Sequence, residues 1–256
     1  MESSAQNIIE TNHLKKTFPG KGRGQAVEAV RGISFQVKKG EIIGFYGLVG
    51  AGKTELARAI YGIDPYDGEI VFKGNKLPQD TFKVIEAGIA LVPEERRSQG
   101  IFTLLTIKRN IPVMNFKKIS NHGIVNSARE NEASEAYINK LSIRTDTMEK
   151  ETSKLSGGNQ QKVVFAKCLF ADADLLILDE PTRGIDVGAK SEIYQIVRNL
   201  SEAGKTILLF SSELPEILSQ CDRIFLLYEG YERMEIKNGT SEMNSEKIIH
   251  IVTGGK

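Results

Sequence analysis

Hydrophobic residues along the chain fall into short runs of strand length that alternate with segments of helical periodicity. Five such runs end in turn-forming or acidic residues: "EIIGFYG", "GIALVP", "DLLILDEP", "KTILLFSS" and "RIFLLYEG". Residues 187–204, between the third and fourth runs, place four aliphatic residues at helical spacing: Ile193, Ile196, Val197 and Leu200. Because buried strands joined by helices are typical of parallel sheets, the pattern predicts an α/β protein with a largely parallel central sheet.

The remaining parts of the chain follow other patterns. "IIETNHL", "ISFQV" and "GEIVFKG" show some alternation and are joined by turns, which predicts an N-terminal antiparallel layer. Residues 95–155 contain no strong strand but include an amphipathic segment, 127–141, with Ala133, Ala136, Tyr137 and Leu141 on one side. We therefore expect a helical insertion between two core strands. Residues 19–25 ("PGKGRGQ") are expected to form a mobile basic loop.

Composition narrows the class of protein. Of the 256 residues, 40% are hydrophobic and 26% are charged, and the net charge is +1, so no strongly basic surface for nucleic acid is expected. No apolar run reaches the roughly 18 residues of a membrane span, and the first sixteen residues lack the apolar core of a secretory signal. Cys168 and Cys221 have no metal-binding spacing and are predicted to be reduced core residues.

The first motif that indicates chemistry is "GLVGAGKT", which lies between a buried strand and the helix "KTELARAIYG". Its glycines let backbone N–H groups surround a β-phosphate, Lys53 adds a positive charge near the β and γ oxygens, and Thr54 offers a hydroxyl to Mg²⁺. The alternative is a glycine-rich turn without a ligand. The predicted nucleotide-binding residues are Gly47, Leu48, Val49, Gly50, Ala51, Gly52, Lys53 and Thr54.

A second motif, "LLILDE", is an apolar strand that ends in two carboxylates. Asp179 is predicted to hold Mg²⁺ through water, and Glu180 to polarise the water that attacks a γ-phosphate, with Lys53 as the other catalytic residue. Alone, this pattern is explained as readily by a solvated strand end. Together with the first motif, it predicts a nucleoside triphosphatase.

The third motif is "LSGGNQQK", residues 155–162, where serine and two glycines precede a helix. It resembles the signature sequence of ABC-type ATPases, and "DEPTRGID" resembles their Walker B strand running into the D-loop, with Asp186 as its acid. More narrowly, "GLVGAGKTEL", "VPEERRSQG", "DEPTRGIDVGAK" and "SSELPEIL" resemble the second, C-terminal ATP-binding half of sugar importers of the ribose, galactose and xylose type. The resemblance covers nearly the whole chain and is weakest over residues 115–151.

This resemblance implies a fold and a set of partners. The fold is a P-loop NTPase (RecA-like) core with an N-terminal antiparallel β layer and an inserted α-helical subdomain. Residues 1–256 would form a single domain, with 95–162 as the helical subdomain and 1–94 and 163–256 as the rest. The ligands would be ATP and Mg²⁺. Ser156, Gly157 and Gly158 would face a nucleotide bound by a second such domain, in the same polypeptide or in a homo- or heterodimer.

Further partners follow from the same resemblance. Transmembrane permease subunits would bind directly and a periplasmic or extracellular sugar-binding protein indirectly, at the cytoplasmic face of the membrane, with no nucleic acid. Phe102, Leu104 and Leu105, in the apolar stretch "GIFTLLTI", would contribute to the permease dock or else be buried inside the helical insertion.

At two positions the chain departs from the usual family pattern, and a third is a candidate for contact with adenine. Glu94 stands where the family usually has glutamine, so it is predicted either to ligate the metal or to be a solvated loop acid. Ser212 stands where many members have a histidine that contacts the γ-phosphate, which predicts slow hydrolysis because serine carries no positive charge. Phe18 is the candidate for stacking on adenine, and packing on the loop that follows it is the alternative.

Two other functions compete with an ATPase that powers transport. One is a regulatory ATP-binding half that supplies its signature residues to a catalytic partner; Ser212 favours it and Glu180 opposes it. The other is an ABC protein of DNA repair or translation, which the neutral charge and the absence of a coiled-coil or basic insertion disfavour.

Overall fold

The computed structural model describes residues 7–20, 25–240 and 244–255. Most of the predicted loop at 19–25, and the first six of the sixteen residues considered for a secretory signal, lie outside these ranges. Among the described helices, none combines the length and the hydrophobicity that crossing a bilayer requires.

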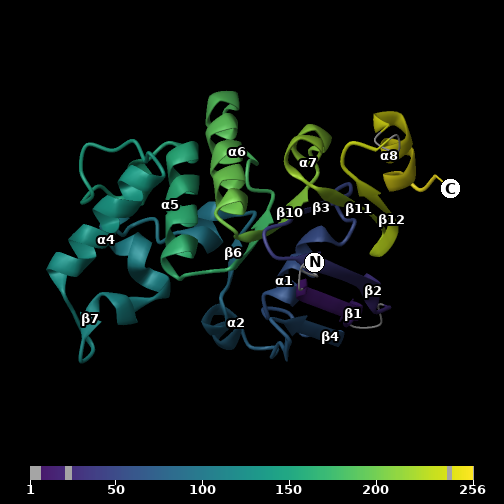
Figure 1. Ribbon diagram of the computed structural model, residues 1–256, viewed down its shortest axis with the longest axis horizontal. Helices are drawn as coiled ribbons and strands as arrows, with labels where there is room; N and C mark the ends of the chain where they lie inside the picture. Colours follow the sequence, from purple (N-terminus) through teal and green to yellow (C-terminus); the bar gives the residue numbers. More distant parts are fainter. Residues whose placement is uncertain (1–6, 21–24, 241–243, 256) are drawn as a thin grey trace, which may run out of the picture.

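A six-stranded sheet forms the centre of the structure (Figure 1), with strand order β12-β11-β3-β10-β9-β6. Neighbouring strands run parallel except for the edge strand β12, which runs antiparallel to β11. The strands are β3 (Ile42–Tyr46), β6 (Ile89–Val92), β9 (Leu175–Asp179), β10 (Thr206–Ser211), β11 (Arg223–Tyr228) and β12 (Tyr231–Lys237). Buried on both faces, the parallel strands are almost wholly apolar, as the sequence pattern predicted.

A second sheet has the order β2-β1-β4-β5 and is antiparallel throughout. It contains β1 (Asn7–Phe18), β2 (Val27–Lys38), β4 (Asp67–Phe72) and β5 (Asn75–Lys76). Buried and exposed residues alternate over much of β1 and β2, so one face packs on the core and the other meets solvent. The predicted antiparallel layer is confirmed.

Helices cover the parallel sheet on both faces. The longest helices are α4 (Ser127–Lys140), α5 (Gly157–Phe170) and α6 (Val187–Glu202). The shorter ones are α1 (Lys53–Ile60), α2 (Thr81–Ala87), α3 (Ile107–Asn110), α7 (Leu214–Gln220) and α8 (Ser245–Val252). Between β6 and α5 the chain also forms a π-helical turn η1 (Arg96–Gly100), the 3₁₀ turns η2 (Ile111–Met114), η3 (Phe116–Lys118) and η4 (Thr152–Lys154), and a hairpin of β7 (Ser120–Asn121) and β8 (Ile124–Val125).

The central sheet separates two hydrophobic clusters, because alternate residues of its strands point to opposite faces. On the face toward β1 and β2, the ring of Phe45 stacks on Phe210 at 4.5 Å and on Phe225 at 5.4 Å between centroids, and Phe35 meets Phe45 edge-on at 5.0 Å. The other cluster includes α5, of which twelve of the fourteen residues are buried.

The structure confirms some local predictions and corrects others. The four aliphatic residues predicted along 187–204 are buried on α6, and both cysteines are buried and unpaired. On α4 the predicted apolar side was wrong at Ala136, which is exposed. Ser134 is the buried residue of α4 instead. Its hydroxyl can be buried because it donates a hydrogen bond to the Lys108 carbonyl at 3.0 Å. The β7–β8 hairpin and β12 were not predicted, since neither carries a clear apolar run.

Replacing Phe210 with alanine should lower the free energy of unfolding by about 3 to 5 kcal/mol, because the fully buried ring leaves a cavity between the sheets. The matched control is Phe82→Ala, at a position 66% exposed, which should change stability by no more than about 0.5 kcal/mol. Urea unfolding at equilibrium measures both. Equal effects would contradict the assignment of Phe210 to a tightly packed core.

Candidate functional site

The loop between β3 and α1 is open at its tip and tightly packed where it enters the helix. Residues 48–50 are exposed at its tip, whereas Gly52 at the start of α1 has φ +96° and no room for a Cβ atom beside the Ala29 carbonyl. Lys53 is buried and its ammonium lies inside the loop, where it donates to the carbonyl oxygens of Gly47 at 2.6 Å and Leu48 at 3.1 Å. The loop therefore presents backbone outward and holds a cation beneath it.

The two carboxylates at the end of β9 meet this loop. The Lys53 ammonium lies 3.5 Å from Glu180 Oε1, and the Thr54 hydroxyl donates to Asp179 Oδ1 at 3.3 Å. The structure therefore brings together the residues of the first two motifs. Glu180 has a φ of +46°, a conformation that a non-glycine residue rarely adopts, and its N–H is held by the Phe210 carbonyl at 2.9 Å.

Burial shifts the protonation of the site. Burial raises the pKa of Asp179 to about 6. The hydrogen bond from the Thr54 hydroxyl opposes this shift, whereas the nearby Glu180 carboxylate adds to it. Burial lowers the pKa of Lys53, although Glu180 and Asp179 act in the opposite direction. Two oxygen atoms, Thr54 Oγ1 of a half-buried residue and Asp179 Oδ1 of a buried one, lie side by side, and such oxygens suit a hard cation. No group of three or more His, Cys, Asp or Glu side chains suited to a metal occurs among the described residues.

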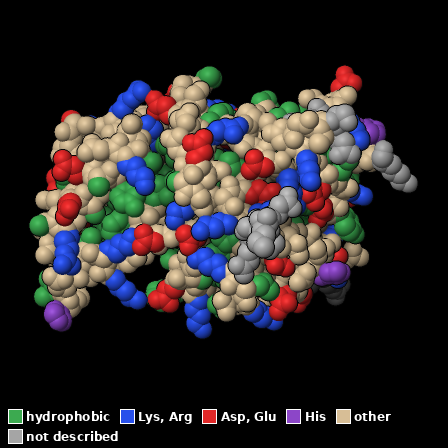
Figure 2. Space-filling model, in the orientation of Figure 1, with side chains coloured by type: hydrophobic (Ala, Val, Ile, Leu, Met, Phe, Trp, Pro, Cys, Tyr) green, Lys and Arg blue, Asp and Glu red, His purple; other side chains and the backbone are tan. Residues whose placement is uncertain are grey.

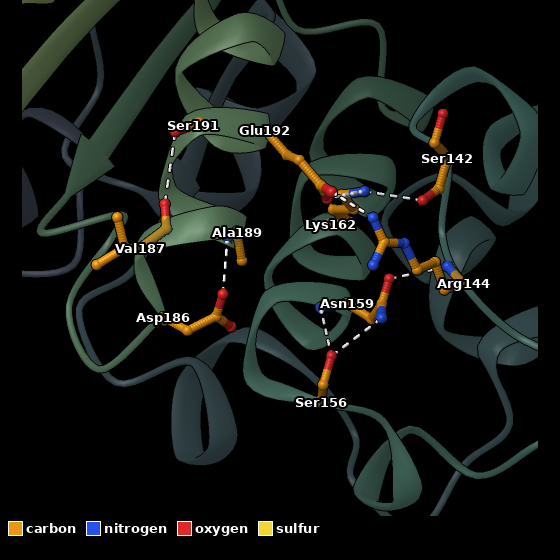
Figure 3. Close-up of polar contacts among 10 residues, drawn as sticks. All are labelled: Ser142, Arg144, Ser156, Asn159, Lys162, Asp186, Val187, Ala189, Ser191 and Glu192. Carbon is orange, nitrogen blue, oxygen red and sulfur yellow. Dashed lines mark hydrogen bonds and ion pairs between the residues drawn. The ribbon is translucent and has the colours of Figure 1, made fainter.

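Ser156 immediately precedes α5 (Figure 3), and Gly157 and Gly158 are the first two residues of the helix. Ser156 is exposed and caps the helix, and its hydroxyl oxygen accepts from the Asn159 N–H at 3.4 Å. A Cβ atom on Gly158 would lie 2.6 Å from Ala189 Cβ on α6, so glycine is what permits the two helix starts to approach. The segment lies against residues 184–189, at the end of the loop that Glu180 begins.

Arg96 joins this segment to the region of Glu94. Its guanidinium donates to the carbonyl oxygens of Arg183 at 2.9 Å and Gly184 at 3.3 Å, and a Cβ atom on Gly157 would lie 2.9 Å from it. Glu94, the predicted metal ligand or loop acid, forms an ion pair with Arg183. Sequence reasoning missed Arg96 and Arg183, because no local pattern indicates which carbonyl or carboxylate a distant arginine will reach.

The other predicted positions lie at the margins of the site. Phe18 is the last residue of β1, 38% exposed, with the Lys16 ammonium 4.7 Å from its ring centroid. Ser212 follows β10 and is half-buried. Its neighbour Glu213 binds Lys190 of α6 through both carboxylate oxygens at 2.6 Å.

A buried acid supports the loop that carries Glu180. Glu216 on α7 is 1% exposed, and its Oε1 accepts a hydrogen bond from the Thr182 hydroxyl at 2.9 Å. Burial raises the pKa of Glu216 to about 7, against the opposing effect of the Ser211 and Thr182 hydroxyls. The sequence motif "SSELPEIL" contains this residue, but its burial depends on how α7 packs against the sheet.

Comparison with known proteins places these features in a family. The family model described as ABC transporter matches residues 30–183, more than half of the chain. An L-arabinose transport ATP-binding protein from Geobacillus stearothermophilus is 46% identical over 225 residues, covering 86% of this chain and 44% of that protein. A xylose import ATP-binding protein from Thermoanaerobacter pseudethanolicus is 43% identical over 242 residues, covering 93% and 46%.

A third relative is similar to the same extent. The ribose import ATP-binding protein of Oceanobacillus iheyensis is 45% identical over 225 residues, which cover 87% of this chain and 45% of that protein. The chain thus spans a little less than half the length of these relatives.

Solved structures agree with the fold. A dimeric ATP-binding cassette in a post-hydrolysis state, bound to ADP and phosphate, superposes with a TM-score of 0.77 at 22% identity, over 90% of this chain and 98% of that one. A nucleotide-free ATP-binding cassette from an ABC transporter gives a TM-score of 0.77 at 21% identity, over 97% and 96%. The predicted P-loop NTPase fold is confirmed.

Replacing Glu216 with glutamine should stabilise the fold more at about pH 8 than at about pH 5. Between the ordinary pKa of 4.5 and the folded value of about 7, the folded chain holds a proton that the unfolded chain releases. The free energy of unfolding of the wild type therefore falls as the pH rises through this range, and a neutral amide removes the loss. We expect a difference of about 2 to 3 kcal/mol between the two pH values, measured by urea unfolding.

The control for this comparison is Glu132→Gln, at an exposed position of α4. It should track the wild type at both pH values. A Glu216→Gln variant that also tracks the wild type would show that the buried carboxyl titrates at its ordinary pH.

Proposed function

The chain belongs to the ABC transporter family, and from this premise we propose that it binds and hydrolyses Mg-ATP to power sugar import. The observation that carries the proposal is the meeting of the loop after β3 with the end of β9. There the buried Lys53 ammonium lies 3.5 Å from the half-buried Glu180 carboxylate, and the Thr54 hydroxyl lies 3.3 Å from the buried Asp179 carboxylate. An arrangement of this kind has little structural purpose by itself, since burying separate charges is costly.

In the proposed reaction each residue has a defined task. The exposed backbone at residues 48–50 would surround the β-phosphate, and Lys53 would turn from the loop carbonyls to the β and γ oxygens. Glu180 would orient the attacking water and accept its proton. The strained backbone of Glu180, held by the Phe210 carbonyl, would keep that carboxylate at the strand end.

Thr54 and Asp179 are the residues that would hold Mg²⁺, Asp179 through water. When bound, Mg²⁺ would neutralise charge on the β and γ phosphate oxygens. The raised pKa of Asp179 fits this role, because a cation favours the ionised form that burial disfavours. Glu94, which pairs with Arg183, would have to leave that partner before it could join the metal site.

Completion of the site would require a second ATP-binding domain. Ser156, Gly157 and Gly158 would face the γ-phosphate held by that domain, and ATP would draw the two together. The relatives are about twice as long as this chain, which fits a protein in which one polypeptide supplies both domains. By the resemblance of its motifs, this chain would correspond to the C-terminal domain of the two. Phe18 would stack on adenine at the edge of the nucleotide.

A groove on the surface is suited to receive a permease subunit at the cytoplasmic face of the membrane. It has a volume of about 860 Å³ and is lined by apolar residues of α2, η2 and η3 together with Phe102, which is 53% exposed. Leu104 is 81% exposed, so burial within the helical segment does not apply to Phe102 or Leu104, whereas Leu105 is half-buried. Figure 2 also shows hydrophobic side chains gathered over α4 and α5, on the left of the view.

A second candidate is a regulatory domain that binds ATP firmly, hydrolyses it slowly and supplies Ser156–Gly158 to a catalytic partner. The observation that favours it is Ser212, which carries no positive charge where many relatives of this fold are expected to have histidine. The two candidates share nucleotide binding and differ in the role of Glu180.

Replacing Lys53 with alanine should weaken Mg-ATP binding by about 10- to 100-fold, because one charge-assisted contact to the phosphates is lost. Titration with a fluorescent ATP analogue measures the affinity. Lys76→Ala is the control, since its side chain is 72% exposed on the edge strand β5 and should leave the affinity unchanged. No binding by the wild type, or equal binding by both variants, would refute the proposed function.

Replacing Glu180 with glutamine should lower ATP turnover by about 100-fold or more while Mg-ATP still binds, because the amide cannot accept the proton of water. Turnover at saturating ATP, read as phosphate release, distinguishes the candidates. If the variant turns over at the wild-type rate, the regulatory role is favoured and catalysis by Glu180 is refuted.

A further inference from the structure

Polar side chains surround the start of α5 and bond to one another. Figure 3 shows the side chain of Ser156, just before α5, pointing to Asn159, which in turn lies next to Arg144, with Glu192 of α6 close by. A small hollow of about 180 Å³ lies between the two helix starts, lined by Arg144, Ser156, Asn159 and Glu192 among others. The hydrogen bonds in this cluster have a defined direction.

The orientation of the Asn159 amide follows from its partners. The backbone N–H of Arg144 can only donate, and it lies 2.8 Å from Asn159 Oδ1, so the oxygen must face it. The amide nitrogen then faces Ser156 Oγ at 3.0 Å and donates to it. The backbone N–H of Asn159 donates to the same oxygen at 3.4 Å.

These two donors use the acceptor capacity of the Ser156 hydroxyl. A hydroxyl has two acceptor positions and one proton, so the proton must point elsewhere. Within the described part of the chain no group accepts it, and Ser156 is exposed. The hydroxyl is therefore held as an outward donor, which is the polarity that an anionic oxygen requires.

The loop that orients Asn159 is itself held in place. The buried ammonium of Lys162 donates to the Ser142 carbonyl at 2.8 Å and pairs with Glu192 at 2.8 Å. Glu192 also pairs with the Arg144 guanidinium at 2.6 Å. Through these contacts α5 and α6 fix the backbone of residues 142–144, and with it the Arg144 N–H.

The geometry points to Asn159 as a positioning residue that keeps the Ser156 hydroxyl directed toward the γ-phosphate of the nucleotide bound by the partner domain. This inference rests on the proposed function. Asn159 acts through Ser156 and does not itself need to touch the nucleotide. Leucine at this position has similar size and suits a helix, but it cannot donate to Ser156 or accept from Arg144.

The test is a double-mutant cycle on the full chain. Asn159→Leu should lower turnover at saturating Mg-ATP by about tenfold, while the affinity of its own P-loop for Mg-ATP stays within about twofold of the wild type. In the Ser156→Ala background the same substitution should have no further effect, because no hydroxyl is left to orient. Asn139→Leu, at an exposed position of α4, is the matched control and should leave turnover unchanged.

Equal losses in both backgrounds would mean that Asn159 merely supports α5, and unchanged turnover would mean that it has no role; either result overturns the inference. If Asn159→Leu does not fold, as judged by circular dichroism and Mg-ATP binding, Asn159→Ala enters the same cycle. A second measurement avoids hydrolysis: the ATP-dependent self-association of the Glu180→Gln chain is followed by sedimentation velocity. Asn159→Leu should weaken this self-association by about tenfold, but only when Ser156 is present. A chain that binds no Mg-ATP refutes the proposed function, whereas one that binds and pairs but ignores Asn159→Leu refutes only the role of Asn159.

Discussion

The register of β3, β10 and β9 decides where chemistry can occur in this chain. Strands β3 and β9 both pair in parallel with β10. This pairing places Tyr46 opposite Ser211 and Asp179 opposite Phe210. The strands therefore end at one level, so the loop after β3 and the acids after β9 meet across the end of β10. A shift of one residue would turn the aromatic face of β10 away from its cluster, so packing between the sheets enforces the register.

That meeting has an electrostatic cost. Asp179 and Lys53 are both buried. Burial raises the pKa of Asp179 and lowers the pKa of Lys53, so it favours the neutral form of each group. Each group is stabilised by a neighbour of the site itself: Asp179 by the Thr54 hydroxyl and Lys53 by the Glu180 carboxylate.

Away from this centre, polar contacts rather than apolar packing tie together the segments that face outward. Arg96 binds the carbonyl oxygens of Arg183 and Gly184, and Lys162, Glu192 and Arg144 link α5, α6 and the loop between α4 and η4. Such contacts suit an exposed surface, because polar groups there can also bind water, whereas exposed apolar groups are unfavourable in water. They also give hydrogen-bond donors a fixed direction, which apolar packing cannot do.

Much of this protein can be predicted from the sequence alone, for a local reason. The buried strands, α6, the glycine-rich loop after β3 and the acids at the end of β9 are contiguous patterns that can be recognised from residues a few positions apart. The neighbours of Glu94 and Ser156, the burial of Glu216 and the exposure of Ala136 could not be predicted in this way. They depend on contacts with Arg183, on the bond between Asn159 and Arg144, and on the packing of α7 and α4. Only the tertiary structure brings these groups together. Hydrogen bonds and burial act between residues that are distant in the sequence, so they leave no periodic pattern in the chain.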